Sequence, residues 1–231
     1  MWVLGMICVP IILWTVGASA LPWAISANVM ILAAAMALAL FRAWGGTKTV
    51  QTVALILTFA WLLEYVGSTT GFPFGDYTYT TRIQPQIGHV PMIIPLAWLM
   101  MLPPAWAIGQ ILAGPQTLRV AAVSALAFTA WDFFLDPQMV SWGVWQWQTP
   151  GGYFGIPWQN FLGWILGAFL LTLIVRPRPL PVARPLAVYG ITWFLQTVGL
   201  WFFWDMPGPA LVGGLLMGIF LGTALWRHAR P

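Results

Sequence analysis

The sequence predicts an all-α fold, a polytopic membrane helix bundle of seven or eight transmembrane helices with two aromatic-rich loops over one face. Of the 231 residues, 60% are apolar and only 6% are charged, whereas a soluble domain carries about 25% charged residues. Apolar runs recur along the whole chain at close to the ~20 residues that a membrane-spanning helix needs. The breaks between the runs carry proline or glycine, which interrupt helices. We therefore expect a single integral membrane domain over residues 1–231.

Each expected span is an apolar run that ends at such a break or at a polar segment. The first run begins at Met1 with no basic residue before it and no small-residue cleavage site, so we expect a retained helix, kinked at Pro10. Several runs are short, which leaves the count between seven and eight. The eight expected spans are Trp2–Ala18, Trp23–Phe41, Val50–Val66, Val90–Leu112, Val120–Leu135, Phe161–Val175, Leu186–Trp204 and Ala210–Trp226.

The basic residues predict how the bundle is oriented. Lys and Arg collect at the cytoplasmic ends of membrane helices. With eight spans and a cytoplasmic N-terminus, every Lys and Arg except Arg82 falls on the cytoplasmic side. We therefore expect a multi-pass protein of the cell membrane with both termini in the cytoplasm. All five acidic residues then lie at or near the opposite face.

Composition also bounds the partners and cofactors. The net charge is +4, but the bases are scattered at helix ends without a clustered stripe, which argues against nucleic acid as a partner. The single cysteine, Cys8, excludes a disulfide framework and a Cys-ligated zinc or iron–sulfur site. The two histidines, His89 and His228, are far apart in the sequence. We expect no metal site.

Two long connections lie on the acidic side, over about residues 67–89 and 136–160. Connections of this length without a helix are uncommon in compact proteins and are usually functional or disordered. Both are too aromatic for a solvated tail. We expect both to fold back over the helix ends.

Acidic residues inside apolar helical sequence are the main functional signal. Ionisable groups in a bilayer are costly and mark functional sites by default. Glu64 and Asp132 each follow an apolar run, and Asp132 and Asp136 are four residues apart, on one face of a helix. Two like charges at this spacing repel, so at least one carboxyl group is expected to stay protonated and able to donate a proton. The candidate catalytic residues are Asp132, Asp136, Glu64 and Asp76.

A structural alternative remains for each acid. Asp136 precedes Pro137 and fits a turn at the end of a helix. Glu64 has an alternative ion-pair partner in Arg82, and Asp76 and Asp205 lie in sequence that is typical of turns. Asp132 is the hardest to explain by structure alone.

Aromatic residues crowd the same side. Most of the 17 tryptophans fit the belts at the two membrane interfaces. Aromatic faces also stabilise cations, so acids beside aromatics suggest acid-initiated chemistry on an alkene. Asn160 fits a helix N-cap equally well, and His89 either supports the acids or is structural. The candidate substrate-binding residues are Tyr77, Tyr79, Trp145, Tyr153, Trp158 and Asn160.

Three blocks of sequence resemble the carotenoid 1,2-hydratase family. They run from Glu64 to Tyr79 (EYVGSTTGFPFGDYTY), from Trp131 to Pro137 (WDFFLDP) and from Gly152 to Trp164 (GYFGIPWQNFLGW). The blocks cover about a quarter of the chain and occur in this order. This family includes 1′,2′-hydratases of monocyclic carotenoids and bisanhydrobacterioruberin hydratases.

The resemblance implies a cofactor-independent membrane enzyme that adds water across the terminal C1=C2 double bond of a linear carotenoid end and gives a tertiary alcohol. From expected burial we assign Asp132 as the proton donor. Asp136 or Glu64 is the expected group that holds and deprotonates water, and Asp76 is the next candidate. The expected partners are a lipid-soluble carotenoid and the bilayer; the identity of the carotenoid and the oligomeric state stay open.

Three other functions compete with this interpretation. A carotenoid cyclase, of the lycopene type, begins with the same protonation but captures the cation with an internal double bond. A prenyltransferase needs several acids and basic partners for a diphosphate, and only Arg82 lies on the acidic side. A proton-coupled transporter is expected to have acids along the depth of the bilayer, whereas here they gather at one face.

Overall fold

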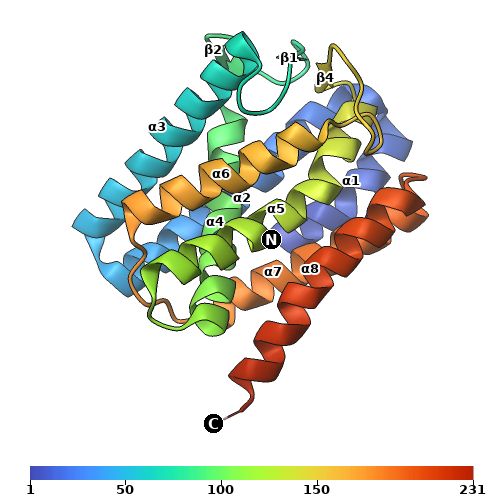
Figure 1. Ribbon diagram of the computed structural model, residues 1–231. Helices are drawn as coiled ribbons and strands as arrows, with labels where there is room; N and C mark the ends of the chain where they lie inside the picture. The colour runs from blue at the N-terminus through green and yellow to red at the C-terminus, as the bar shows by residue number, and fades with distance from the viewer. Residues whose placement is uncertain (231) are drawn as a thin grey trace.

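The computed structural model describes residues 1–230 and contains eight α-helices in a bundle (Figure 1). The fold class is confirmed, and each helix covers most of one expected span. The helices are α1 (Trp2–Val16), α2 (Leu21–Trp44), α3 (Gly46–Thr70), α4 (Ile93–Ala113), α5 (Thr117–Ser141), α6 (Trp158–Val175), α7 (Ala183–Phe202) and α8 (Pro207–His228), with a short 3-10 turn, η1 (Ala18–Ala20), before α2.

Six of these helices are long and apolar enough to cross a membrane, which supports a multi-pass membrane protein. Helix α1 has only 15 residues, and α7, which begins at its basic end with Arg184, is also outside the six. Helix α4 has no charged residue and is buried over most of its length, so it forms the centre of the bundle. A Cβ at Gly109 would collide with Ser124, so α4 and α5 approach closely there.

Two helices extend four or more residues beyond their expected ends. Helix α3 reaches Thr70 instead of Val66, and α5 reaches Ser141 instead of Leu135. The expected turn at Asp136-Pro137 is wrong, because α5 continues through Pro137. The first connection is accordingly shifted to residues 71–92, and the second is shorter than expected, over residues 142–157.

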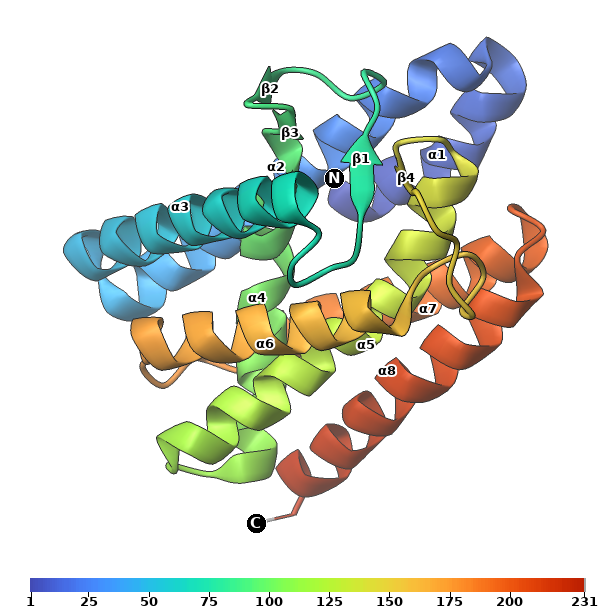
Figure 2. The same ribbon diagram turned by 45° about the horizontal axis from the view of Figure 1, so that its top comes forward.

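The two connections fold back over the same end of the bundle, as expected, and pair with each other (Figure 2). Strand β1 (Tyr77–Tyr79) runs antiparallel to β4 (Trp145–Trp147), and a second small pair joins β2 (Gln86–Ile87) to β3 (Val90–Pro91). Side chains alternate across a strand. Thr78 and Gln146 are therefore exposed, while the four aromatic residues at the ends of β1 and β4 are turned toward the bundle.

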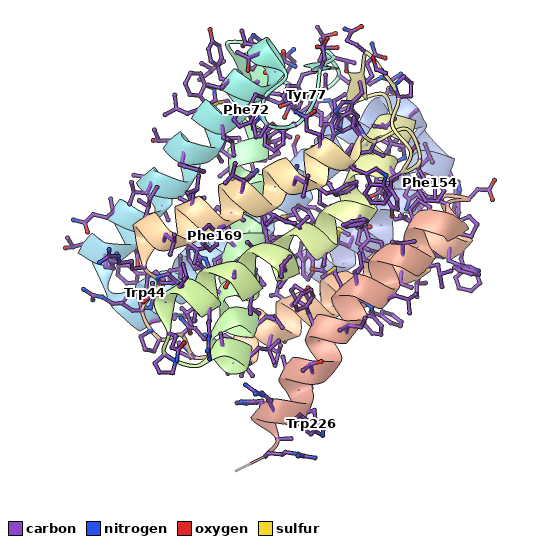
Figure 3. All side chains as sticks on the ribbon, viewed as in Figure 1. Trp44, Phe72, Tyr77, Phe154, Phe169 and Trp226 are labelled. Atoms are coloured by element: carbon purple, nitrogen blue, oxygen red, sulfur yellow. The ribbon has the colours of Figure 1, made fainter. Side chains whose placement is uncertain are left out.

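Phe74 anchors the first connection between two helices. It is fully buried, and a Cβ at Gly67 of α3 or at Gly163 of α6 would lie within 2.6 Å of its ring. The two glycines thus leave room for one aromatic ring between α3 and α6. Figure 3 shows Tyr77 at this end of the molecule and Trp226 at the far end of α8.

Candidate active site

Two carboxyl groups of α5 share one amide partner. Asp132 and Asp136 lie one helical turn apart and are 0% and 2% exposed. Asn160 Nδ2 donates a hydrogen bond to Asp132 Oδ2 at 3.0 Å and a second, short one to Asp136 Oδ2. Asn160 is the third residue of α6, whose N-cap is Pro157, so the side chain does not cap the helix. Its amide instead holds the two carboxyl groups against α6.

Pro137 alters α5 between these carboxyl groups and the loop. A proline has no N–H, so residue 137 cannot donate to the carbonyl of Phe133, four residues earlier. The hydroxyl of Tyr153 donates to this Phe133 carbonyl at 2.9 Å. Burial and the nearby carboxyl groups of Asp132 and Asp136 raise the pKa of Tyr153 above its ordinary value, so its hydroxyl stays a donor. The second loop therefore replaces the backbone hydrogen bond that α5 loses.

Glu64 of α3 is the third buried carboxyl group, 3% exposed. Its Oε2 accepts hydrogen bonds from the Tyr77 hydroxyl at 2.6 Å and from the Tyr79 hydroxyl at 2.7 Å. Burial and the adjacent Glu64 carboxyl raise the pKa of both tyrosines well above the ordinary value, which keeps both hydroxyls protonated. The expected alternative, an ion pair with Arg82, is not formed: Arg82 is exposed and Glu64 is bound by tyrosines.

Helices α3, α4, α5 and α6 and the β1–β4 pair line a small cavity of about 20 Å³. Glu64, Asp136 and Asn160 line it, together with Tyr77 and Tyr79. One water molecule needs roughly 10–15 Å³ of such volume and two to four polar partners. The cavity therefore fits a single water molecule beside two carboxyl groups.

Aromatic rings form the other walls of this cavity. Trp145 Nε1 donates to Asp136 Oδ1 at 3.1 Å, and Trp147 Nε1 donates to the carbonyl of Phe74 at 3.1 Å. Trp164 of α6 also lines the cavity, and its ring stacks on Trp98 of α4 with ring centroids 5.1 Å apart. The sequence alone assigns no site role to Trp98 or Trp164, because a tryptophan within an apolar helix does not differ in sequence from a residue of the interfacial belt.

The other candidate residues lie outside this cavity. Asp76 is exposed, and Asp205 is an exposed turn residue with φ 52° between α7 and α8. His89 is exposed, with its Nε2 3.0 Å from Ser68 Oγ, and does not contact the acids. Tyr153 is buried behind Phe133, and Trp158, 58% exposed, packs on Tyr153. The structure thus brings together Asp132, Asp136, Glu64, Tyr77, Tyr79, Trp145 and Asn160.

Comparison with known proteins agrees with the three sequence blocks. A family model described as carotenoid biosynthesis protein matches residues 25–225, a range that contains the whole carboxyl cluster. The chain is also similar to the bisanhydrobacterioruberin hydratase of Haloarcula japonica, with 32% identity over 127 residues, or 53% of this chain. That match spans 42% of the relative's own length. No solved structure matches the chain. The resemblance to carotenoid hydratases is therefore confirmed, and this chain belongs to the carotenoid biosynthesis protein family.

Proposed function

We propose that this chain is a carotenoid hydratase that adds water across the terminal C1=C2 double bond of a linear carotenoid end and produces a tertiary alcohol. The observation that carries the proposal is a cavity that fits one water molecule and is lined by the buried carboxyl groups of Glu64 and Asp136, with the third buried carboxyl group, that of Asp132, linked to Asp136 through Asn160. Acid-catalysed hydration needs a proton donor, a water molecule and a base for that water. The cluster offers all three without a cofactor.

Asp132 is the proposed proton donor. It is fully buried, and its Oδ1 has no hydrogen-bond partner within residues 1–230. Two neighbouring buried carboxyl groups disfavour a double negative charge and hold a proton between them. The proton moves from Asp132 to C2 of the alkene, which leaves the positive charge on C1, where two methyl groups stabilise it.

Glu64 is the proposed base for the attacking water. Both oxygens of Asp136 already accept hydrogen bonds, from Trp145 and Asn160. Glu64 uses Oε2 for both tyrosines, and in the described part of the chain no donor is bound to its Oε1. This oxygen accepts the proton when the water oxygen bonds to C1. Asp132 loses one proton to the alkene and Glu64 gains one from water, so the cluster carries the same number of protons before and after the reaction.

Aromatic rings support the charged intermediate. Tyr79, Trp145 and Trp164 line the cavity. An aromatic face stabilises a desolvated cation by about 2 kcal/mol. The same walls keep a second water molecule and other nucleophiles from the cation.

The decisive experiment incubates the purified full chain with a linear carotenoid in detergent and ¹⁸O-labelled water. The hydratase yields a product heavier by one labelled water molecule, with the label on C1. A product of unchanged mass identifies a cyclase and contradicts the proposal. Asp132→Asn, measured in parallel, tests whether the product depends on the carboxyl cluster.

A further inference from the structure

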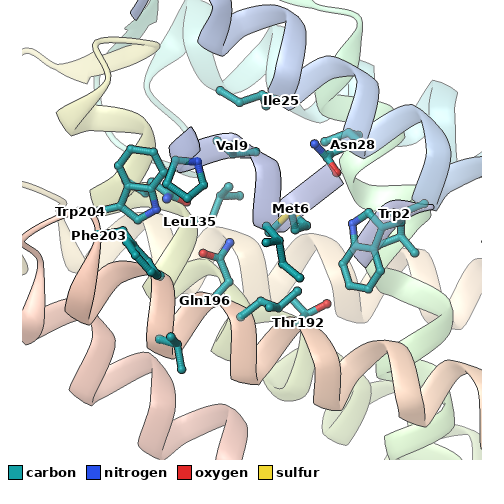
Figure 4. A pocket seen from close by; sticks show the side chains of 18 of the residues that line it. Trp2, Met6, Val9, Ile25, Asn28, Leu135, Thr192, Gln196, Phe203 and Trp204 are labelled. Atoms are coloured by element: carbon teal, nitrogen blue, oxygen red, sulfur yellow. The ribbon is translucent and has the colours of Figure 1, made fainter. Parts of the chain in front are cut away.

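A second and larger cavity lies beside the carboxyl cluster. This groove, of about 490 Å³, is lined by residues of α1, α2, α5 and α7 (Figure 4). Its volume is in the range of small-molecule sites, roughly 300–1,000 Å³. Leu135 of α5 lines both the groove and the small cavity, so the two spaces adjoin at this side chain.

The groove is open along α1. Three of its lining residues on this helix, Ile7, Ile11 and Trp14, are 47%, 47% and 64% exposed. In a membrane this side faces the lipid, so an apolar molecule can enter from the bilayer. None of the described residues that line the groove is charged. A phospholipid headgroup therefore finds no ionic partner in it.

Besides Asn28, whose Nδ2 donates to the carbonyl of Ala24, two glutamine amides lie in this apolar lining. Gln138 of α5 and Gln196 of α7 are 5% and 8% exposed, and neither side chain makes a hydrogen bond within residues 1–230. Figure 4 shows Gln196 pointing from α7 into the groove, on the side where Leu135 lies. An amide that faces an apolar groove without a protein partner is free to bind a polar group of a ligand. The two amides therefore indicate a ligand that carries a polar, uncharged group.

We propose that the groove binds a polyene alcohol, with its hydroxyl group hydrogen-bonded to Gln138 and Gln196 and its apolar chain along α1 and α2. An amide both donates and accepts, which suits a hydroxyl group. The choice of a polyene alcohol rests on the proposed function, whose product is such a molecule. The new alcohol group passes Leu135 and is held by the amides before release into the bilayer.

The test compares the binding of a matched pair of ligands, lycopene and its 1-hydroxy-1,2-dihydro derivative. Binding is measured by quenching of tryptophan emission in detergent, on the full chain with Asp132→Asn to prevent turnover. The starting protein should prefer the alcohol by about fivefold, as expected for a net hydrogen bond. Gln196→Leu and Gln138→Leu should each reduce the ratio of alcohol affinity to hydrocarbon affinity toward one. The affinity for lycopene should not change.

A matched control is Gln51→Leu, at an exposed position of α3 away from the groove. It should keep the preference. If a leucine variant does not fold, the corresponding Gln→Met variant, which keeps the length of the side chain, replaces it. An equal preference for the alcohol in all variants, or an equal loss of affinity for both ligands, overturns the proposal.

The two proposals fail in different ways. If labelled water enters the product but the glutamine variants bind both ligands as the parent chain does, only the groove proposal is contradicted. If alcohol binding depends on the glutamines but the parent chain hydrates no carotenoid, only the proposed reaction is contradicted.

Discussion

The hydrogen bond from Tyr153 to the Phe133 carbonyl offers a sharp test of how the active-site helix is built. We predict that Tyr153→Phe destabilises the protein and slows hydration, whereas the same change has little effect once Pro137 is replaced by alanine. Phenylalanine keeps the contacts of the ring with Phe133 and Phe161, whose centroids lie 5.0 and 5.3 Å away. Only the hydroxyl, 2.9 Å from the carbonyl oxygen, is removed.

The size of the effect follows from the burial of this carbonyl. Leaving a buried polar group without a partner costs about 1–3 kcal/mol. In the Pro137→Ala variant, a backbone N–H is present four residues after Phe133 and donates to the same carbonyl. The loss caused by Tyr153→Phe should then fall below about 0.5 kcal/mol, which gives a coupling free energy of about 1 kcal/mol or more.

Activity should follow the same pattern. Phe133 lies next to Asp132, and small displacements of catalytic groups cost up to ~100-fold in rate. We expect Tyr153→Phe to lower the hydration rate by roughly tenfold in the parent chain. In the Pro137→Ala variant, the same change should lower the rate much less.

The assay is a double-mutant cycle on unfolding free energy in mixed detergent, with the hydration rate measured on the same four proteins. Tyr65→Phe is the control, because Tyr65 is exposed and its hydroxyl makes no hydrogen bond in the described structure. Equal losses from Tyr153→Phe in the parent chain and in the Pro137→Ala variant would refute the reasoning, since the hydroxyl would then not replace the missing N–H.

Three further predictions test the site and its orientation. Asp132→Asn should fold and insert but lose roughly 100-fold or more in hydration rate, the scale of a lost general acid; near-normal turnover moves the donor role to another acid. Trp145→Leu should lower the turnover rate about tenfold with a smaller change in apparent affinity, while Trp226→Leu at the opposite end should not; equal effects would indicate a role in folding or anchoring. A reporter after Arg230 should be cytoplasmic and a tag near Thr78 accessible from the other side; tags on the same side would show that the number of spans is wrong by one.

The helices and the paired aspartates could be predicted because both depend on local sequence. An apolar run predicts a span, and a spacing of four places two side chains on one helix face whatever surrounds them. The extension of α5 through Pro137 could not be predicted, because the Tyr153 hydroxyl that donates to the Phe133 carbonyl comes from a different segment. In isolation, Asp136-Pro137 favours a turn.

The pairing of β1 with β4 could not be predicted from the sequence either. Each strand has three residues, and the partners are 66 to 70 residues apart, so neither segment shows a strand pattern of its own. The roles of Asn160 and of the two glutamines depend in the same way on which helices become neighbours. Polar residues in apolar sequence could be flagged, but their partners could not be named.

The position of the cluster accounts for how two reactants of opposite polarity meet in the proposed reaction. The carboxyl groups lie near the loop end of α3 and α5, under β1 and β4, so water has a short path from the aqueous side. In this proposal the carotenoid dissolves in the bilayer and reaches, along α1, the groove that adjoins the cavity at Leu135. Only the alkene end has to pass this side chain, and it then meets a space for one water molecule. In the proposed reaction the alkene end reaches the cavity past Leu135, and the cation forms beside the water that Glu64 is proposed to hold.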